Sequence, residues 1–243
     1  MSREVLRSLV WAGAMAVALL TGCASTLEPE PAPPGARQAA GPAFKVGDYW
    51  EYVVRDAYSG SIRGLYRYTV SRADPDRVVF DLTRDGQRFD THIHTPGLRG
   101  LEHPLRNLQR FRFNPPYPAY AFPLYPGQRW RSIVTSTDPV TGRTYQTHVH
   151  ANVRGWRRIK VPAGEFDALE VRRAVYAGNA ESFRLQEEIV ETDWFAPSVG
   201  FAVVSEGYSS HLDTSRSAGG HPERPLRVRG DWLIAELVRY STQ

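Results

Sequence analysis

Four of the seven histidines form two His-x-His pairs, a spacing that could serve metal chemistry. Side chains two residues apart on a β-strand point to the same face, so two neighbouring strands with such pairs could offer three or four imidazoles to Zn²⁺. The simpler interpretation places all four on solvated faces, because Ile93 falls in the inward-facing set with Phe89 and Val149 is inward-facing on the second strand. We therefore assign no metal site and keep as weak candidates His92, His94, His148 and His150.

A row of carboxylates in one predicted strand is the second group that could do chemistry. Glu187, Glu191 and Asp193 share a face there, as general acids or bases would. Arg172 and Arg173 lie in the preceding predicted strand, so cross-strand ion pairing explains the row more simply. The chain has no Gly-x-Ser-x-Gly, Walker, His-Glu-x-x-His or Gly-x-Gly-x-x-Gly motif. No catalytic residue and no cofactor are predicted.

The most distinctive stretch, from Phe111 to Trp130, holds seven aromatic residues and five prolines. An aromatic loop stiffened by proline could stack on sugar rings or line the mouth of an apolar cavity, and its arginines could pair with an anionic ligand. Alternatively, the loop packs its rings over an open end of a sheet. The candidate ligand-binding residues are Tyr117, Tyr120, Phe122, Tyr125, Arg112 and Arg129.

The elements that must position these residues are strands, because short runs of alternating apolar and polar residues dominate the chain after residue 43. Asp85-Gly86 between two such runs predicts a hairpin. We predict an all-β fold of about ten antiparallel strands, a sandwich or partly open barrel, with at most one short helix over Pro104 to Arg112. The predicted strands are 49–54, 62–73, 77–84, 89–93, 130–136, 145–160, 168–177, 183–195, 201–209 and 231–240.

The pattern of the N-terminal residues indicates an export signal. Arg3 and Arg7 precede an uncharged apolar run, residues 9–20, which as a helix would span only about 18 Å of a hydrocarbon core of about 30 Å. Leu20-Thr21-Gly22-Cys23 follows and resembles the lipobox of bacterial lipoproteins. The resemblance implies cleavage after residue 22 and a lipid anchor at Cys23, and the lack of an Asp after the cysteine implies the outer membrane, facing the periplasm.

The rest of the chain divides into a tether and a body. Residues 23–43 contain five prolines and little apolar surface, which predicts a disordered Pro/Ala-rich tether. Residues 44–243 form a single β-rich domain, with two similar halves, 44–110 and 119–243, as an open alternative. The single cysteine excludes an intramolecular disulfide. A net charge of +4 is too balanced to indicate nucleic-acid binding.

Four motifs in the body carry a resemblance: F-K-V-G-D-Y-W-E-Y (44–52), V-P-A-G-E-F-D-A (161–168), D-W-F-A-P-S-V-G (193–200) and E-L-V-R-Y (236–240). Together they resemble those of a group of uncharacterised bacterial envelope lipoproteins and secreted β-rich domains. The resemblance implies an antiparallel β fold and brings no enzyme activity with it. The motifs themselves indicate tight turns, since Pro and Gly recur at fixed places in them.

Three functional hypotheses follow. The leading one is a non-enzymatic lipoprotein whose periplasmic β domain binds an apolar or amphipathic ligand, a glycan or an envelope partner through the side of the molecule formed by 111–130. The second is a structural envelope protein that docks on another protein through that loop. The third is a hydrolase that uses a metal held by the histidine pairs.

Overall fold

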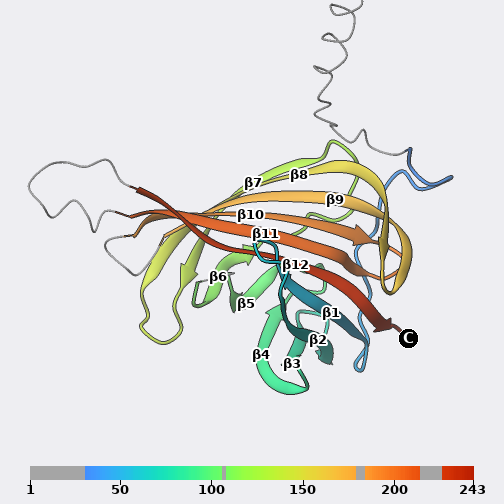
Figure 1. Cartoon of the computed structure of the whole chain (residues 1–243), viewed down its shortest axis with the longest axis horizontal. Coiled ribbons are helices and arrows are strands. Elements are labelled where there is room, and N and C mark those ends of the chain that lie inside the picture. Colours follow the sequence, from blue (N-terminus) through green and yellow to red (C-terminus); the bar gives the residue numbers. More distant parts are fainter. Residues whose placement is uncertain (1–30, 106–107, 179–183, 214–225) are drawn as a thin grey trace, which may run out of the picture.

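The computed structural model describes residues 31–105, 108–178, 184–213 and 226–243, and every regular element in these ranges is a β-strand (Figure 1). Consecutive strands pair antiparallel, and β1 pairs with both β2 and β12, which closes the sheet into a barrel. No helix in the described ranges is long and apolar enough to cross a membrane. The strands are β1 (Tyr49–Asp56), β2 (Ile62–Ala73), β3 (Val78–Arg84), β4 (Gln87–His94), β5 (Gly100–Pro104), β6 (Arg110–Tyr117), β7 (Arg129–Thr137), β8 (Thr144–Val161), β9 (Gly164–Ala177), β10 (Arg184–Ala196), β11 (Phe201–Asp213) and β12 (Leu226–Ser241).

The all-β, antiparallel prediction is confirmed, but the predicted sandwich or partly open barrel of about ten strands is wrong. Two of the strands, β5 and β6, are not among those predicted from the sequence. β5 is only five residues long and does not alternate, and β6 overlaps the aromatic stretch 111–130, whose prolines indicate a loop. These two strands connect β4 to β7 and so complete the barrel.

The predicted helix over Pro104 to Arg112 is absent from the described part of that segment. Pro104 ends β5 and Arg110 begins β6. The helical spacing of Leu105, Leu108 and Phe111 has another cause, because all three side chains are buried in one core cluster. Leu105 and Leu108 lie between the two strands and Phe111 lies in β6, so buried residues can have the spacing of one helix face without a helix.

The hairpin between β3 and β4 forms as predicted. Asp85 and Gly86 have φ angles of 51° and 79°, the left-handed values that an Asp-Gly turn supplies. The carboxylate of Asp85 also accepts a hydrogen bond of 2.8 Å from the backbone N–H of Leu65, which ties the hairpin to β2.

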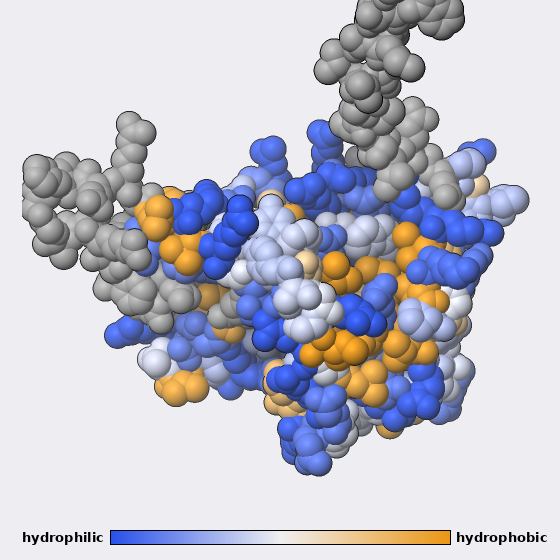
Figure 2. Space-filling model, viewed as in Figure 1, coloured by the Kyte–Doolittle hydropathy of each residue, from blue (hydrophilic) through white to orange (hydrophobic). Residues whose placement is uncertain are grey.

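The barrel interior holds two clusters of buried apolar residues. The larger one includes Trp50, Phe80, Leu169 and Leu237, and the smaller one includes Phe111. Trp50 donates from its indole nitrogen to the carbonyl oxygen of Val199 at 3.0 Å, so the β1 strand is fixed to the turn between β10 and β11. On the outside, Figure 2 shows hydrophilic residues over much of the face in view, with apolar residues gathered where β1 and β12 run.

The chain reaches the barrel before β1 begins. Ala39 is buried and forms a β-bridge with Leu124, with backbone hydrogen bonds of 2.7 and 2.8 Å. Phe44 then packs edge-on against Trp50 and Phe80, at ring-centroid distances of 5.7 and 5.3 Å. The part of the expected tether from Ala39 onward is therefore in contact with the body.

Candidate ligand-binding site

The barrel contains a cavity of about 580 Å³ where the two core clusters meet. Its size falls in the range of small-molecule sites, and its walls are mostly apolar. Eight of the residues that line the cavity are aromatic and come from β1, β2, β3, β4 and β11 and from the 111–130 stretch. They are Tyr52, Tyr66, Tyr68, Phe80, Phe89, Tyr117, Tyr120 and Phe201.

Strand alternation explains how these rings reach the cavity. On β1, the predicted inward set of Trp50, Tyr52 and Val54 is buried, with Tyr52 and Val54 in the cavity wall. Phe80 is 1% exposed and meets Phe201 at a ring-centroid distance of 5.7 Å. The packing of rings from different strands gives the wall a fixed shape.

A buried ion cluster lies on one side of the cavity. Arg173 of β9 is paired in register with Glu191 of β10, and its guanidinium donates from Nε to Glu191 at 3.0 Å and from Nη2 to Asp193 at 2.7 Å. The third nitrogen, Nη1, donates to the carbonyl oxygen of Ala119 at 3.1 Å. The cross-strand ion pairing predicted for this face is thus confirmed for Arg173, whereas Arg172 is paired in register with Thr192.

The electrostatics keep this cluster charged. Burial alone would lower the pKa of Arg173, but the neighbouring Asp193 and Glu191 carboxylates together raise it well above its usual range. Burial likewise opposes ionisation of Asp193, yet the charge of Arg173 and hydrogen bonds from Ser205, Tyr120 and Arg173 lower its pKa. Both side chains are at most 7% exposed.

Two of the six predicted ligand-binding residues join this cluster. The hydroxyl of Tyr120 donates to Asp193 at 2.7 Å, and that of Tyr117 donates to Glu191 at 3.4 Å. Burial, with the nearby carboxylates, raises the pKa of both phenols, so both remain neutral donors. Tyr117 and Tyr120 therefore belong to the cavity wall.

The structure does not bring the other four to the cavity. Phe122 is half-buried and stacks on Tyr120 with a ring-centroid distance of 5.5 Å, so it packs against a wall residue without lining the cavity itself. Tyr125 is 48% exposed. Arg112 lies on the outside, where it donates to Glu102 at 2.8 Å, and Arg129 is also exposed.

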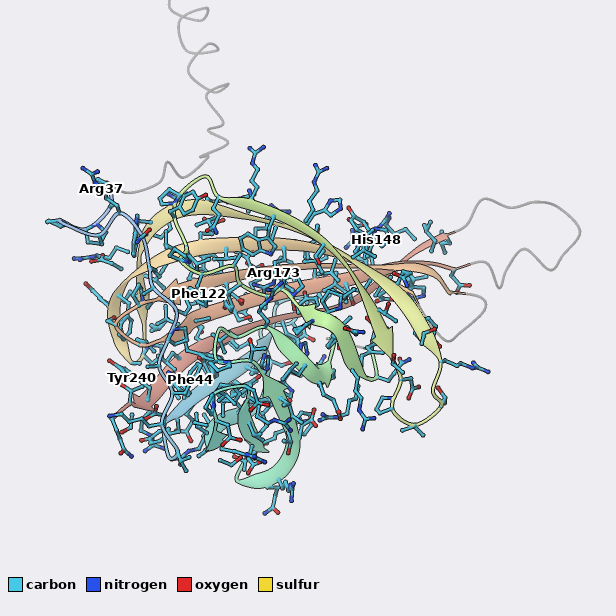
Figure 3. All side chains as sticks on the ribbon, turned by 180° about the vertical axis from the view of Figure 1, so that it is seen from behind. Arg37, Phe44, Phe122, His148, Arg173 and Tyr240 are labelled. Atoms are coloured by element: carbon cyan, nitrogen blue, oxygen red, sulfur yellow. The ribbon has the colours of Figure 1, made fainter. Side chains whose placement is uncertain are left out.

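The histidine pairs separate in the fold. β4 and β8 are not neighbours, because β5, β6 and β7 lie between them in the barrel. His148 and His150 are exposed on β8, as predicted, and Figure 3 shows His148 on the outer side of the ribbon while Arg173 lies within the fold. In the ranges that the structure describes, no group of three or more His, Cys, Asp or Glu side chains has an arrangement that could hold a metal ion.

His92 and His94, by contrast, line the cavity, so their predicted outward orientation is wrong. The cause is a β-bulge on β4: Leu82 pairs with Asp90 and Thr83 with Arg88, which leaves Phe89 as an extra residue. One extra residue reverses which side chains face inward beyond it.

A third histidine, His103 of β5, completes a stack of imidazoles in the wall. Its ring is 5.1 Å from that of His94 and 5.7 Å from that of His92. Nδ1 of His103 lies 2.8 Å from the carbonyl oxygen of Pro104 and must donate to it, so Nε2 carries the lone pair. Nε2 of His103 and Nδ1 of His94 are buried without a protein hydrogen-bond partner.

Burial keeps the inner imidazoles neutral. It lowers the pKa of His94 well below its usual value and that of His103 to about 4, with repulsion from neighbouring histidines adding to both shifts. Nearby, burial opposes ionisation of Asp90, but hydrogen bonds from His92, Thr91 and Arg110 hold its pKa well below the usual range.

Sequence reasoning missed His103 and gave Arg173 no place in a binding site. For Arg173 a signal was present, because it stands in an inward-facing row with Val171 and Val175, and a charge in an apolar row marks a buried polar site. For His103 no such signal existed, because β5 was not recognised.

The fold and the site together define a closed antiparallel β-barrel with an aromatic cavity and a buried ion cluster in its wall. No protein-family model and no curated protein matches the sequence. Among solved structures, a protein of Parabacteroides distasonis described as "a putative lipoprotein" shares the fold, with a TM-score of 0.50, 14% identity and coverage of 84% of this chain and 99% of the other. A Bacteroides fragilis protein described as "a putative exported protein with YmcC-like fold" has a TM-score of 0.48, 13% identity and coverage of 84% and 100%.

Proposed function

We propose that the chain is a lipid-anchored protein of the bacterial outer membrane, facing the periplasm, whose barrel binds an apolar or amphipathic molecule in the aromatic cavity. The observation that carries the proposal is the cavity itself, which has about 580 Å³ of space among eight aromatic side chains. A protein interior that binds no ligand is packed at high density, so a cavity of this size indicates a binding site.

The anchor rests on the sequence around Cys23, and the fold shared with a protein described as a lipoprotein agrees with it. The wall combines polar side chains, such as Arg173 and His103, with apolar ones, such as Leu82. A wall of this mixed composition suits a molecule with an apolar body and a polar end.

Native mass spectrometry of the full chain, purified gently from a bacterial envelope, tests the proposal. We expect a discrete non-covalent mass that solvent releases. Ala235 lies in the cavity wall on β12 and its neighbour Ile234 does not, so Ala235→Trp fills the cavity and Ile234→Trp is the matched control.

The bound mass should disappear in Ala235→Trp and persist in Ile234→Trp. A wild-type chain that carries no such mass, and that takes up no added amphiphile either, would contradict the binding function. It would favour the alternative in which the protein docks on another envelope protein.

A further inference from the structure

The charged side chains in the cavity wall are mostly acidic. Among the described residues that line the cavity, three carry a carboxylate and one carries a guanidinium. The carboxylates are those of Asp90, Glu191 and Asp193, and the guanidinium is that of Arg173. Asp90 has a partner outside the wall, Arg110, to which it is hydrogen-bonded. The cavity surface as a whole therefore has a negative formal charge.

The one arginine among the described wall residues is already paired with two carboxylates. Each of its three nitrogens donates to a protein acceptor, on Glu191, Asp193 and the Ala119 carbonyl. An anionic headgroup at the two remaining N–H groups of Arg173 would lie close to the carboxylates of Glu191 and Asp193, which repel it.

Two of the histidines in the wall, His94 and His103, do not offset the negative charge. Burial lowers the pKa values of His94 and His103, so both are neutral at pH 7. A neutral imidazole with a lone pair, as at Nε2 of His103, offers an acceptor and not a charge for an anion.

The aromatic walls favour a cation by a separate mechanism. Ring faces carry partial negative charge and attract ammonium and guanidinium groups. The wall already shows one such contact, because the guanidinium of Arg173 lies 5.4 Å from the ring centroid of Tyr120. The rings of Tyr52, Tyr68 and Phe201 also line the cavity.

We infer that the cavity selects molecules with an ammonium-type headgroup on an apolar body and discriminates against anionic amphiphiles such as fatty acids. This inference rests on the proposed binding function and specifies its ligand class. It corrects the expectation that arginines of the 111–130 stretch would attract an anionic ligand, since Arg112 and Arg129 lie outside the cavity.

Three probes of equal chain length test the inference by isothermal titration calorimetry at pH 7: hexyltrimethylammonium, hexan-1-ol and hexanoate. The protein is the full chain with Cys23→Ser, which cannot be acylated, in a non-ionic detergent. We expect the ammonium probe to bind at least tenfold more tightly than the alcohol, and the alcohol more tightly than hexanoate.

Equal affinities for the ammonium probe and the alcohol would overturn the charge inference and leave the binding function intact, as would tighter binding of hexanoate. Binding of none of the three probes would refute both. All three probes are measured on the same protein, so the differences between them do not reflect differences in folding.

Two variants on β10 then test whether Glu191 supplies the negative charge that favours the ammonium probe. Glu191→Gln removes one negative charge from the wall and keeps an oxygen that can accept from Arg173. We expect the ratio of ammonium to alcohol affinity to fall about tenfold. Glu188→Gln is the matched control, because Glu188 lies on the same strand and pairs with Arg227 outside the cavity at 2.8 Å. An unchanged ratio in Glu191→Gln, with alcohol binding retained, would refute the assignment.

Discussion

The neutral, buried His103 makes the stability of the barrel depend on pH in a way that can be calculated. Its pKa is about 4 in the folded chain, against 6.5 for an exposed histidine. Between these values the unfolded chain binds a proton that the folded chain does not. Stability must therefore fall as the pH drops from about 6.5 to about 4, and the contribution of His103 levels off below that.

The size of the effect follows from the difference between the two pKa values. Each pKa unit corresponds to about 1.4 kcal/mol, so His103 should cost the folded state about 3 kcal/mol between pH 7 and pH 4. The exposed fraction of His103 is only 9%, so solvent screening does not reduce this figure much. His94 acts in the same direction, and the pH dependence of the wild type should exceed the share of His103 alone.

Urea unfolding of the wild type and of His103→Asn at several pH values between 4 and 7 measures how much His103 contributes to the pH dependence of stability. The Asn amide can donate to the Pro104 carbonyl as Nδ1 of His103 does, but it does not titrate. Loss of the ring lowers the stability of the variant equally at every pH. The difference between the two proteins should therefore shrink by about 3 kcal/mol on going from pH 7 to pH 4. A constant difference across this range would refute the assignment of His103 as a buried neutral imidazole.

Three further predictions concern the cluster, the wall and the anchor. Arg173→Met should lower the free energy of unfolding in urea by about 3–5 kcal/mol, because it leaves the carboxylates of Asp193 and Glu191 without the positive charge that pairs with them, and the loss should be smaller in an Asp193→Asn background. Gly100→Ala should destabilise by about 1–3 kcal/mol, because a Cβ there would lie 2.1 Å from Nε2 of His103. His103→Ala should remove that penalty in a double-mutant cycle, and a penalty that persists would point to backbone strain at Gly100 instead. Cys23→Ser should abolish incorporation of labelled fatty acid and release the chain from the membrane fraction, and labelling of the variant would disprove the lipid attachment site.

Regular alternation made much of the barrel predictable from sequence. β2 has the bounds that the sequence predicted, and on β1 and β3 the inward rows that contain Tyr52 and Phe80 are buried as expected. In these strands the local pattern and the global fold agree, because each strand has one buried face and one solvated face.

The prediction failed where a register shift or a short strand interrupted the alternation. The extra residue at Phe89 reverses the orientation of His92 and His94, and nothing in the local composition marks the bulge. Within the 111–130 stretch, residue type alone could not separate Tyr117 and Tyr120, which face inward, from Tyr125, which is exposed. That choice depends on how β6 and the following segment cross the barrel, which is a tertiary property.

The bridge between Ala39 and Leu124 also limits how far the barrel could lie from a membrane to which Cys23 were anchored. Sixteen residue steps separate Cys23 from Ala39, and a fully extended chain of that length spans about 55 Å. With Cys23 held at the bilayer surface, the barrel could not drift farther than this from the lipid headgroups. A molecule that leaves the membrane for the cavity, or the cavity for the membrane, would cross a gap of no more than a few protein radii.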